Sequence, residues 1–476
     1  MKNQMNLLAV ALGTGIIVVP CVSLTANPFK VTADKPNIIY ILADDLGYGD
    51  LSFLGQKRFK TPNIDQLAAS GLVFTNHYSG STVSAPSRCA LFTGMHTGHS
   101  YIRGNKEMKP EGQEPIPDGI TTLAELMKKA GYATGAFGKW GLGGPGTEGD
   151  PVNQGFDEFF GYNCQGLAHN YYPGHLWHNR EKIILTENAG NATGIWAPDL
   201  IHENALKFME ANRDNPFFLF YPTTIPHAEL VAPERWMEKF RGKLLPEKSF
   251  KGTDDGPNYR KGPYGSQPEA HAAFAAMVSR LDEQVGEILH KLKELGIEGN
   301  TIVMFTSDNG AHLEGGADPD YFDSNGPWTG YKRDLTEGGI HVPFIVSWPG
   351  KVQHGTTGHI SAFWDILPTF CEIAGIKNPG KTDGISFYPT LAGLPGKQKE
   401  HTFLYWEFHE RGTSKAIRMG SWKGIKKGLT VPLELYDLST DPGEKTNLAV
   451  KNPSVVAKIE KLMVSQRTES ALWPAK

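Results

Sequence analysis

Short apolar runs alternate with amphipathic segments between residues 36 and 384, and this alternation constrains the fold more than any other feature. The run Asn37–Ala43 is largely apolar, as in a parallel strand that is buried on both faces. Similar runs at Ala133–Phe137, Phe217–Tyr221 and Thr301–Phe305 predict further strands of the same kind. Helices between parallel strands cover both faces of the sheet they connect. The sequence therefore predicts an α/β fold with a large, mainly parallel sheet sandwiched by helices.

Two of the predicted helices have clear end signals. Thr122 and Glu125 have the spacing of a capping box, in which each side chain accepts a hydrogen bond from the backbone of the other residue. Apolar residues at helical spacing begin at Phe274 and continue for more than five turns, and we expect that helix to end at Gly296. The segment 241–265 lacks any such periodicity and predicts a long surface loop that can form a pocket wall.

The pattern of the chain changes after residue 394. Short strand-like segments joined by turns follow, and residues 453–467 then show helical spacing. The expected strands are residues 402–408, 416–419, 422–426 and 433–437. We therefore predict three parts, which are a signal peptide at 1–26, the large α/β domain at 27–394, and a small antiparallel sheet with a helix at 395–476.

The N-terminus predicts an exported, periplasmic protein. A basic start is followed by an apolar segment at residues 7–19, which is too short to span a membrane, and by small residues near Ala26. Cys21 offers a lipoprotein anchor as an alternative, but the preceding Pro20 fits that signal poorly. No later segment has the apolar length of a stable membrane span. A net charge of -4 argues against nucleic-acid binding through bulk positive charge.

The chain has four cysteines, whose spacing fits neither a zinc cluster nor a dense disulfide framework. Cys21 is expected to leave with the signal peptide. Whether two of the remaining three, Cys89, Cys164 and Cys371, form a disulfide is left open by the sequence.

Four predicted strands lead into residues that carry chemistry. They are followed by Asp44-Asp45, Gly138-Lys139, Pro226-His227 and Asp308-Asn309-Gly310. In an open α/β sheet, ligands bind at the carboxyl ends of the strands, so we expect one site at this edge. The oxygen donors of Asp44, Asp45, Asp308 and Asn309 suit Ca2+ or Mg2+ rather than zinc.

The most specific motif is Ser84-Ala85-Pro86-Ser87-Arg88, followed by Thr93-Gly94. Here the chain resembles the formylglycine-dependent sulfatases of the alkaline phosphatase superfamily, whose motif begins with Cys or Ser. Further segments match that family at residues 37–50, 307–310, 332–339 and 435–444. The resemblance spans about residues 36 to 448. Within the family, the chain is similar to bacterial glycan sulfatases near the galactosamine-sulfatase and arylsulfatase A groups. The resemblance implies an alkaline-phosphatase-like sheet.

The resemblance implies that a radical-type maturase converts Ser84 to formylglycine. It also implies that Ca2+, with Mg2+ as an alternative, binds Asp44, Asp45, Asp308, Asn309 and the group at position 84. A hydrated aldehyde carries two hydroxyls on one carbon, so that one attacks sulfur and the other then expels sulfate. An unmodified serine has a single hydroxyl and lacks the second step, so we expect little or no turnover without the maturase.

The resemblance also assigns the positive charges of the site. Arg88, Lys139 and Lys332 would neutralise a sulfate ester together with the cation. His227 and Lys332 would bind the sulfate group and protonate the leaving oxygen.

One position departs from the family pattern. Many sulfatases read Gly-Lys-Trp-His-Leu-Gly where this chain has Gly141 in place of the histidine. The departure leaves open which group removes the second proton, and we hypothesise that His169 supplies an imidazole from another loop.

A segment rich in histidine and aromatic residues, 155–177, indicates a sugar-binding wall, although packing of a loop is the plainer interpretation. The residues expected to bind substrate are His169, Asn170, Tyr171, Trp177, Glu407 and His409. We expect exo-acting removal of sulfate from carbon 4 or 6 of galactose or N-acetylgalactosamine in host or algal glycans. The alternatives are a phosphodiesterase or phosphonate monoester hydrolase of the same superfamily, and a glycan-binding relative in which Ser84 is not modified.

Overall fold

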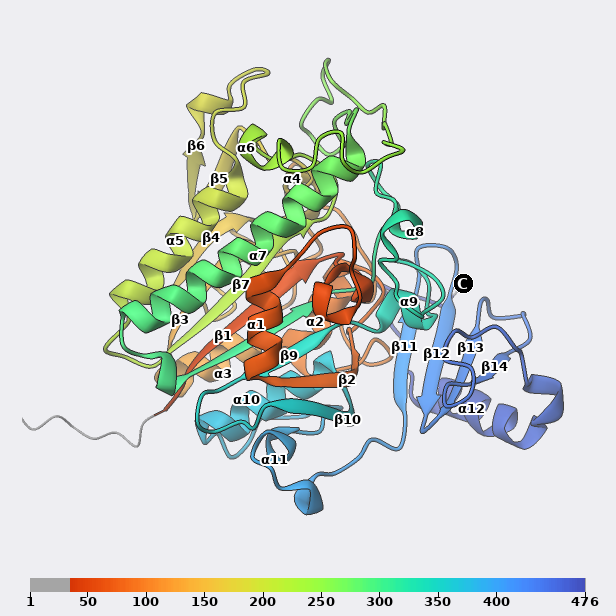
Figure 1. The fold of residues 1–476 in the computed structure, drawn as a ribbon. Coiled ribbons are helices and arrows are strands. Elements are labelled where there is room, and N and C mark those ends of the chain that lie inside the picture. Colours follow the sequence, from red (N-terminus) through yellow and green to blue (C-terminus); the bar gives the residue numbers. More distant parts are fainter. Residues whose placement is uncertain (1–34, 476) are drawn as a thin grey trace, which may run out of the picture. The chain divides into compact units, whose positions relative to one another are not determined.

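The computed structural model describes residues 35–475, which contain a ten-stranded sheet (Figure 1). Its strands are β1 (Asn37–Asp44), β2 (Leu72–Tyr78), β3 (Ala133–Lys139), β4 (Glu158–Tyr162), β5 (His175–His178), β6 (Glu181–Ile184), β7 (Phe217–Pro226), β8 (Thr301–Ser307), β9 (Phe344–Ser347) and β10 (Gly355–Ala362). Their order is β10-β2-β9-β8-β1-β7-β3-β4-β5-β6. The run from β8 to β4 is parallel, which confirms the predicted sheet.

The sheet is mixed at its two sides. Strand β9 runs antiparallel to both β8 and β2, and β5 runs antiparallel to both β4 and β6. These strands have four residues each, so they carry too little periodicity to be recognised in the sequence.

Helices cover both faces of the sheet. The α-helices before residue 392 are α1 (Pro62–Ser70), α2 (Ser84–Thr93), α3 (Leu123–Lys129), α4 (Gln165–Ala168), α5 (Ala197–Ala211), α6 (Glu234–Met237), α7 (Ala270–Glu294), α8 (Pro319–Phe322), α9 (Glu337–Ile340), α10 (Ile366–Ala374) and α11 (Tyr388–Leu391). Ile39 and Ile41 of β1 belong to the apolar cluster with α1, α5 and α7, whereas Ile38, Tyr40 and Leu42 belong to the cluster with α2, α3 and α10. Because successive side chains of a strand point to opposite faces and both faces are covered, residues 38–43 of β1 are apolar.

The helix signals of the sequence are confirmed. Thr122 Oγ1 accepts a hydrogen bond from the Glu125 N–H, and the Glu125 carboxylate accepts one from the Thr122 N–H. Helix α7 ends at Glu294, and Gly296 follows with φ +69°, a left-handed conformation that glycine adopts without strain.

The C-terminal part forms a second, four-stranded antiparallel sheet, as predicted. Its strands are β11 (Leu404–Phe408), β12 (Ser414–Met419), β13 (Trp422–Lys426) and β14 (Glu434–Asp437), and helix α12 (Pro453–Ser465) packs on it. Lys423 of β13 is fully buried and lies 2.7 Å from Glu337 of α9 and 2.9 Å from Glu444. This charged cluster joins the small sheet to the loops of the large one.

The predicted signal peptide and the Cys21 alternative lie outside the described residues. From residue 35 to residue 475, no helix is long and apolar enough to cross a membrane. Cys89, Cys164 and Cys371 are buried and free, so the cysteines of the described chain form no disulfide. The segment 241–265 contains neither a helix nor a strand, in agreement with the predicted loop.

Candidate active site

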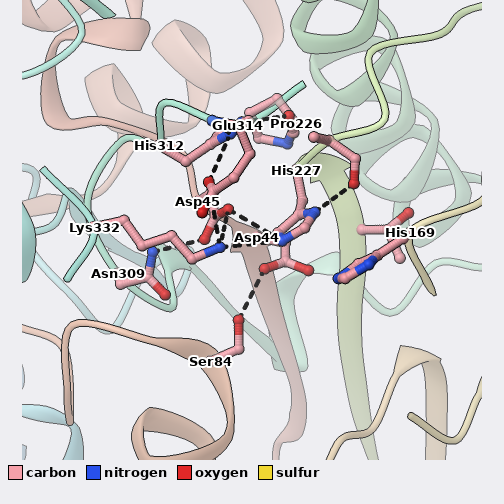
Figure 2. Close-up of polar contacts among 12 residues, drawn as sticks. Asp44, Asp45, Ser84, His169, Pro226, His227, Asn309, His312, Glu314 and Lys332 are labelled. Carbon is pink, nitrogen blue, oxygen red and sulfur yellow. Dashed lines mark hydrogen bonds and ion pairs between the residues drawn. The ribbon is translucent and has the colours of Figure 1, made fainter. Parts of the chain in front are cut away.

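The carboxyl ends of β1, β3, β7 and β8 lie at one edge of the sheet and carry Asp44, Lys139, His227 and Asp308 or their neighbours. Figure 2 shows the residues that follow β1, β7 and β8. Asp44 ends β1 and pairs in register with Pro226 of β7, and the neighbouring Ala43 pairs with Ser307 of β8. Ser84 begins helix α2, and its Oγ donates a hydrogen bond to Asp44 Oδ1 at 3.2 Å. The four strand ends and the start of α2 therefore meet in one buried cluster.

Three buried acidic side chains each pair with a buried basic one. Lys139 Nζ lies 2.6 Å from Asp44 Oδ2, Lys332 Nζ lies 2.8 Å from Asp45 Oδ2, and Arg88 Nη2 lies 2.9 Å from Asp308 Oδ2. Buried charges persist only when such partners compensate for their lost hydration. Burial, followed by the charge of Asp44, raises the pKa of Asp308.

The donor set fits a hard divalent cation. Asn309 Nδ2 donates to Asp45 Oδ1 at 2.7 Å, whereas Asn309 Oδ1 is buried and accepts no hydrogen bond from any described residue. Such an acceptor is costly unless a ligand meets it. The side chains of Asp44, Asp45, Asp308 and Asn309 would hold Ca2+ or Mg2+ through oxygen. Because the three ion pairs already balance, a bound cation would make the site positive and favourable for an anion.

His227 follows β7 and lies against Lys332. The imidazole Nδ1 donates to the Ala228 carbonyl, so Nε2 is left to accept from the Lys332 ammonium at 3.1 Å. Burial, and then the charges of Lys332 and Lys139, hold the pKa of His227 well below its usual value. Burial alone would lower the pKa of Lys332, but Asp45 and Glu314 raise it overall. The proton at this contact therefore belongs to Lys332.

Two further residues of this cluster, His312 and Glu314, were not predicted from the sequence. His312 Nδ1 lies 3.2 Å from a Glu314 carboxylate oxygen, and its ring stacks on that of His227 with centroids 5.6 Å apart (Figure 2). Ligand atoms of Asp45, His312 and Glu314 lie within 4.8 Å of one another. Both residues follow Asn309 in the same loop, so their closeness in the sequence to the predicted metal ligands could have pointed to them.

A cavity of about 460 Å³ opens over this cluster. Its wall includes Ser84, His169, His227 and Lys332, together with Tyr264 of the predicted surface loop. The structure thus brings Ser84, which the sequence analysis predicts as the nucleophile, together with His169, His227 and Lys332.

Three residues expected to bind the sugar do not line this cavity. Tyr171 is fully buried, and its hydroxyl donates to the His227 carbonyl at 2.9 Å, so it supports the His227 loop. Asn170 is also fully buried. The Trp177 indole on β5 donates to Glu111 at 2.6 Å in a neighbouring part of the surface. Of the residues expected in this segment, His169 is the one that reaches the cavity.

Glu407 and His409 do not line the cavity either. Glu407 is fully buried and lies 3.1 Å from Arg103, 3.0 Å from Arg467 and 2.7 Å from His409. Burial raises the pKa of a carboxyl group, but the hydrogen bond from His409 and the charge of Arg103 outweigh it and lower the pKa of Glu407 to about 2. Glu407 lies in ion pairs that hold β11 against distant segments, and the expected contact of Glu407 and His409 with sugar stays a prediction.

We expect Glu407→Gln to lower the free energy of unfolding by about 3–5 kcal/mol, because Arg103 would stay buried without its counter-charge. Because the pKa of Glu407 is lowered, its contribution is present above the ordinary value of 4.5 and is lost as the pH falls toward about 2. Urea unfolding of both proteins across this range measures the difference. Glu434→Gln, at a partly exposed ion pair, should change stability by less than about 1 kcal/mol. A similarly small change in Glu407→Gln would contradict the assignment.

Comparisons with known proteins agree with this geometry. Residues 36–376 match the family described as Sulfatase, and residues 327–469 match the family described as N-sulphoglucosamine sulphohydrolase, C-terminal. The chain is 31% identical to human N-acetylgalactosamine-6-sulfatase over 92% of this chain and 87% of that protein. It is 30% identical to the N-acetylgalactosamine-6-O-sulfatase of Bacteroides thetaiotaomicron over 98% of this chain and 100% of that protein. The crystal structure of Ps i-CgsB in complex with k-i-k-neocarrahexaose is similar with a TM-score of 0.75 at 28% identity, covering 93% of this chain and 95% of that one.

Proposed function

The chain belongs to the sulfatase family and hydrolyses sulfuric esters, and we propose that its substrate is a sulfated sugar at the end of a glycan. Galactose or N-acetylgalactosamine sulfated at carbon 4 or 6 is the proposed sugar. The names of two relatives, an N-acetylgalactosamine-6-sulfatase and an N-acetylgalactosamine-6-O-sulfatase, support N-acetylgalactosamine and carbon 6. The observation that carries the proposal is the cavity that Ser84 lines. Basic side chains and a set of oxygen donors that suits a hard divalent cation are buried beside it. The family match favours sulfate-ester hydrolysis over the phosphodiesterase and binding-protein alternatives.

We propose that Ser84 acts as formylglycine, formed by a radical-type maturase. Its Oγ lies 3.2 Å from Asp44 Oδ1 and 3.3 Å from Lys139 Nζ, so a carboxylate and an ammonium both reach the group at this position. When hydrated, the aldehyde supplies one hydroxyl that attacks sulfur and a second that expels sulfate. Lys139 and Arg88 stabilise negative charge that develops on the group at position 84, and their ion pairs orient the carboxylates of Asp44 and Asp308.

Lys332 is proposed to protonate the leaving oxygen of the sugar. Its ammonium lines the cavity, and it holds the proton at the contact with His227. His227 accepts a hydrogen bond from that ammonium and so fixes its direction. A positioned acid of this kind contributes roughly 10²- to 10⁴-fold to the rate.

His169 is the proposed acceptor of the second proton. Its Nδ1 donates to the Gly262 carbonyl at 2.7 Å, so Nε2 carries the free lone pair, and its ring stacks on His227 with centroids 5.1 Å apart (Figure 2). Burial lowers the pKa of His169 to about 4, so the imidazole is neutral at pH 7 and able to accept a proton.

We expect His169→Ala to lower kcat by about 10²-fold, because a general base is removed while the metal ligands and Lys332 remain. In the wild type, kcat should fall as the pH drops through about 4, where His169 becomes protonated, and this component should be missing from the variant. Steady-state rates across that pH range measure both effects. His354→Ala, at an exposed position, serves as the control. Full turnover in His169→Ala would remove this residue from the mechanism.

A second cavity, of about 620 Å³, adjoins the first. The two share Glu107, Lys109, Gly166 and Lys261 in their walls. We propose that the terminal sugar lies over Ser84 and that the next sugar of the glycan extends into this second cavity. This arrangement supports exo action on an oligosaccharide.

Sulfate release from a panel of defined sugars tests the proposed function. Galactose, N-acetylgalactosamine and N-acetylglucosamine, each sulfated at single positions, are supplied as monosaccharides and as terminal units of disaccharides. The enzyme is produced with a serine-type maturase and assayed with Ca2+ beside Ser84→Ala, and matched phosphate esters measure the competing activity. Release from one sugar and position, absent in Ser84→Ala, is the expected result. Release from none by protein carrying the modification, or a faster rate on phosphate esters, would contradict the proposal.

A further inference from the structure

Gly141 has no side chain to fill the space beside the catalytic cluster. It lies two residues beyond strand β3 and has φ +85°, in the left-handed region. A Cβ atom built on Gly141 would lie 2.7 Å from Gln165 Nε2 and 3.8 Å from Arg88 Cδ. The amide of Gln165 therefore occupies the space next to Arg88 that a side chain at position 141 would fill.

The backbone around Gln165 holds this arrangement in place. The Gly141 N–H donates to the Asn163 carbonyl at 3.1 Å, so the two segments run side by side. Gln165 begins the short helix α4, and its own N–H donates to the Gln113 side chain at 3.3 Å. These hydrogen bonds to two neighbouring segments position Gln165, which is part of the cavity wall.

The Gln165 Nε2 atom is buried and donates to no acceptor within residues 35–475. Buried donors rarely lack a hydrogen-bond acceptor, so we expect a bound ligand to supply one to this atom. Ser84 also lines the cavity, but its Oγ already donates to Asp44 and accepts from Lys139. An oxygen of an anion bound at Ser84 would supply such an acceptor.

We propose that Gln165 Nε2 donates a hydrogen bond to an oxygen of the sulfate group of the substrate, in the place that Gly141 leaves open. The inference rests on the proposed function, since it requires the sulfate group to lie at Ser84. A glutamine amide donates at every pH but does not take up a proton. Gln165 therefore binds the sulfate group without acting as a base, and proton removal is left to His169.

Equilibrium binding to protein made without a maturase tests this role, because Ser84 then stays a serine and turnover does not consume the ligand. The probes are N-acetylgalactosamine 6-sulfate and inorganic sulfate, titrated by calorimetry with Ca2+ present. If the release panel identifies another sulfated sugar, that sugar replaces the first probe. Unsulfated N-acetylgalactosamine is titrated beside them as a reference ligand.

Gln165→Leu keeps the approximate size of the side chain and removes the N–H donor, so the Kd of both sulfated probes should rise about tenfold. Gln165→Glu places a carboxylate beside the sulfate group and should raise the Kd about a hundredfold. Binding of the unsulfated sugar should be unchanged in both variants. Gln66→Leu, at an exposed position of α1, is the matched control and should bind like the wild type.

Gly141→Ala provides an independent second variant. The new Cβ would displace the Gln165 amide, so the Kd should again rise about tenfold, and combining it with Gln165→Leu should add little. Equal Kd values for the wild type and Gln165→Leu, on a probe that the wild type binds, would overturn the inference and leave the sulfatase function intact. If the wild type neither binds the probes nor releases sulfate from any sugar, the proposed function fails instead.

Discussion

Replacing Ser84 by alanine is expected to abolish sulfate release, with kcat lowered by a factor on the order of 10⁴ or more. The methyl group offers no oxygen to accept the sulfate group and gives the maturase nothing to oxidise. Ser84 is buried at the start of α2, and Asp44 keeps its ion pair with Lys139 when the hydroxyl is lost. The fold should therefore survive, and thermal unfolding should match that of the wild type.

Two companion variants make this result specific. Ser84→Cys should recover turnover when it is produced with a maturase that oxidises cysteine, because the same aldehyde then forms at position 84. Ser70→Ala, at the exposed end of α1, should retain full activity. Sulfate release by Ser84→Ala within tenfold of the wild-type rate would show that the group at this position is not the nucleophile.

Asp45→Asn is expected to remove the response of the protein to Ca2+. Asp45 holds Asn309 through one carboxylate oxygen and Lys332 through the other, so neutralising it weakens the donor set and leaves Lys332 without its nearest counter-charge. For the wild type, Ca2+ at a hundred times its Kd should raise the free energy of unfolding by about 2.7 kcal/mol. The variant should show no such increase, and its kcat should fall by roughly 10²- to 10³-fold.

Thermal and urea unfolding, each with Ca2+ and with a chelator, measure this effect independently of activity. Chelator alone should lower the wild-type rate as the substitution does. Asp437→Asn, in the C-terminal sheet at a partly exposed position, is the matched control and should keep the full Ca2+ response. An equal Ca2+ stabilisation of Asp45→Asn would place the cation elsewhere.

The edge of the sheet that carries the site was predictable because strand ends are visible in the sequence. Asp44, Lys139, His227 and Asp308 each follow a run of apolar residues, and the carboxyl ends of parallel strands meet at one edge. The direction of β9 was not predictable, because a four-residue strand has the same composition in either orientation. The mixed character of the sheet thus depends on tertiary pairing.

The substrate-facing residues were predicted less well, for a physical reason. His169 and Tyr171 are two residues apart in an irregular loop, yet one lines the cavity and the other is buried beneath His227. Periodicity does not tell which side chain of such a loop faces outward. The role of Glu407 depends on Arg103 and Arg467, which lie far from it in the sequence.

Gln165 carried no signal in the sequence at all. A glutamine near the start of a short helix is ordinary, and its interest comes from the 2.7 Å between its Nε2 and the Cβ position of Gly141. The missing side chain at position 141 was visible, whereas the residue that fills its place required the structure.

The most direct test of the central claim compares turnover with the extent of modification at Ser84. Preparations with increasing amounts of maturase are analysed by mass spectrometry of the peptide containing Ser84, whose modified form lacks two hydrogen atoms, and sulfate release is assayed on the same samples. Activity should rise in proportion to the modified fraction and extrapolate to zero at no modification. Substantial activity in protein whose Ser84 is entirely unmodified would contradict the account.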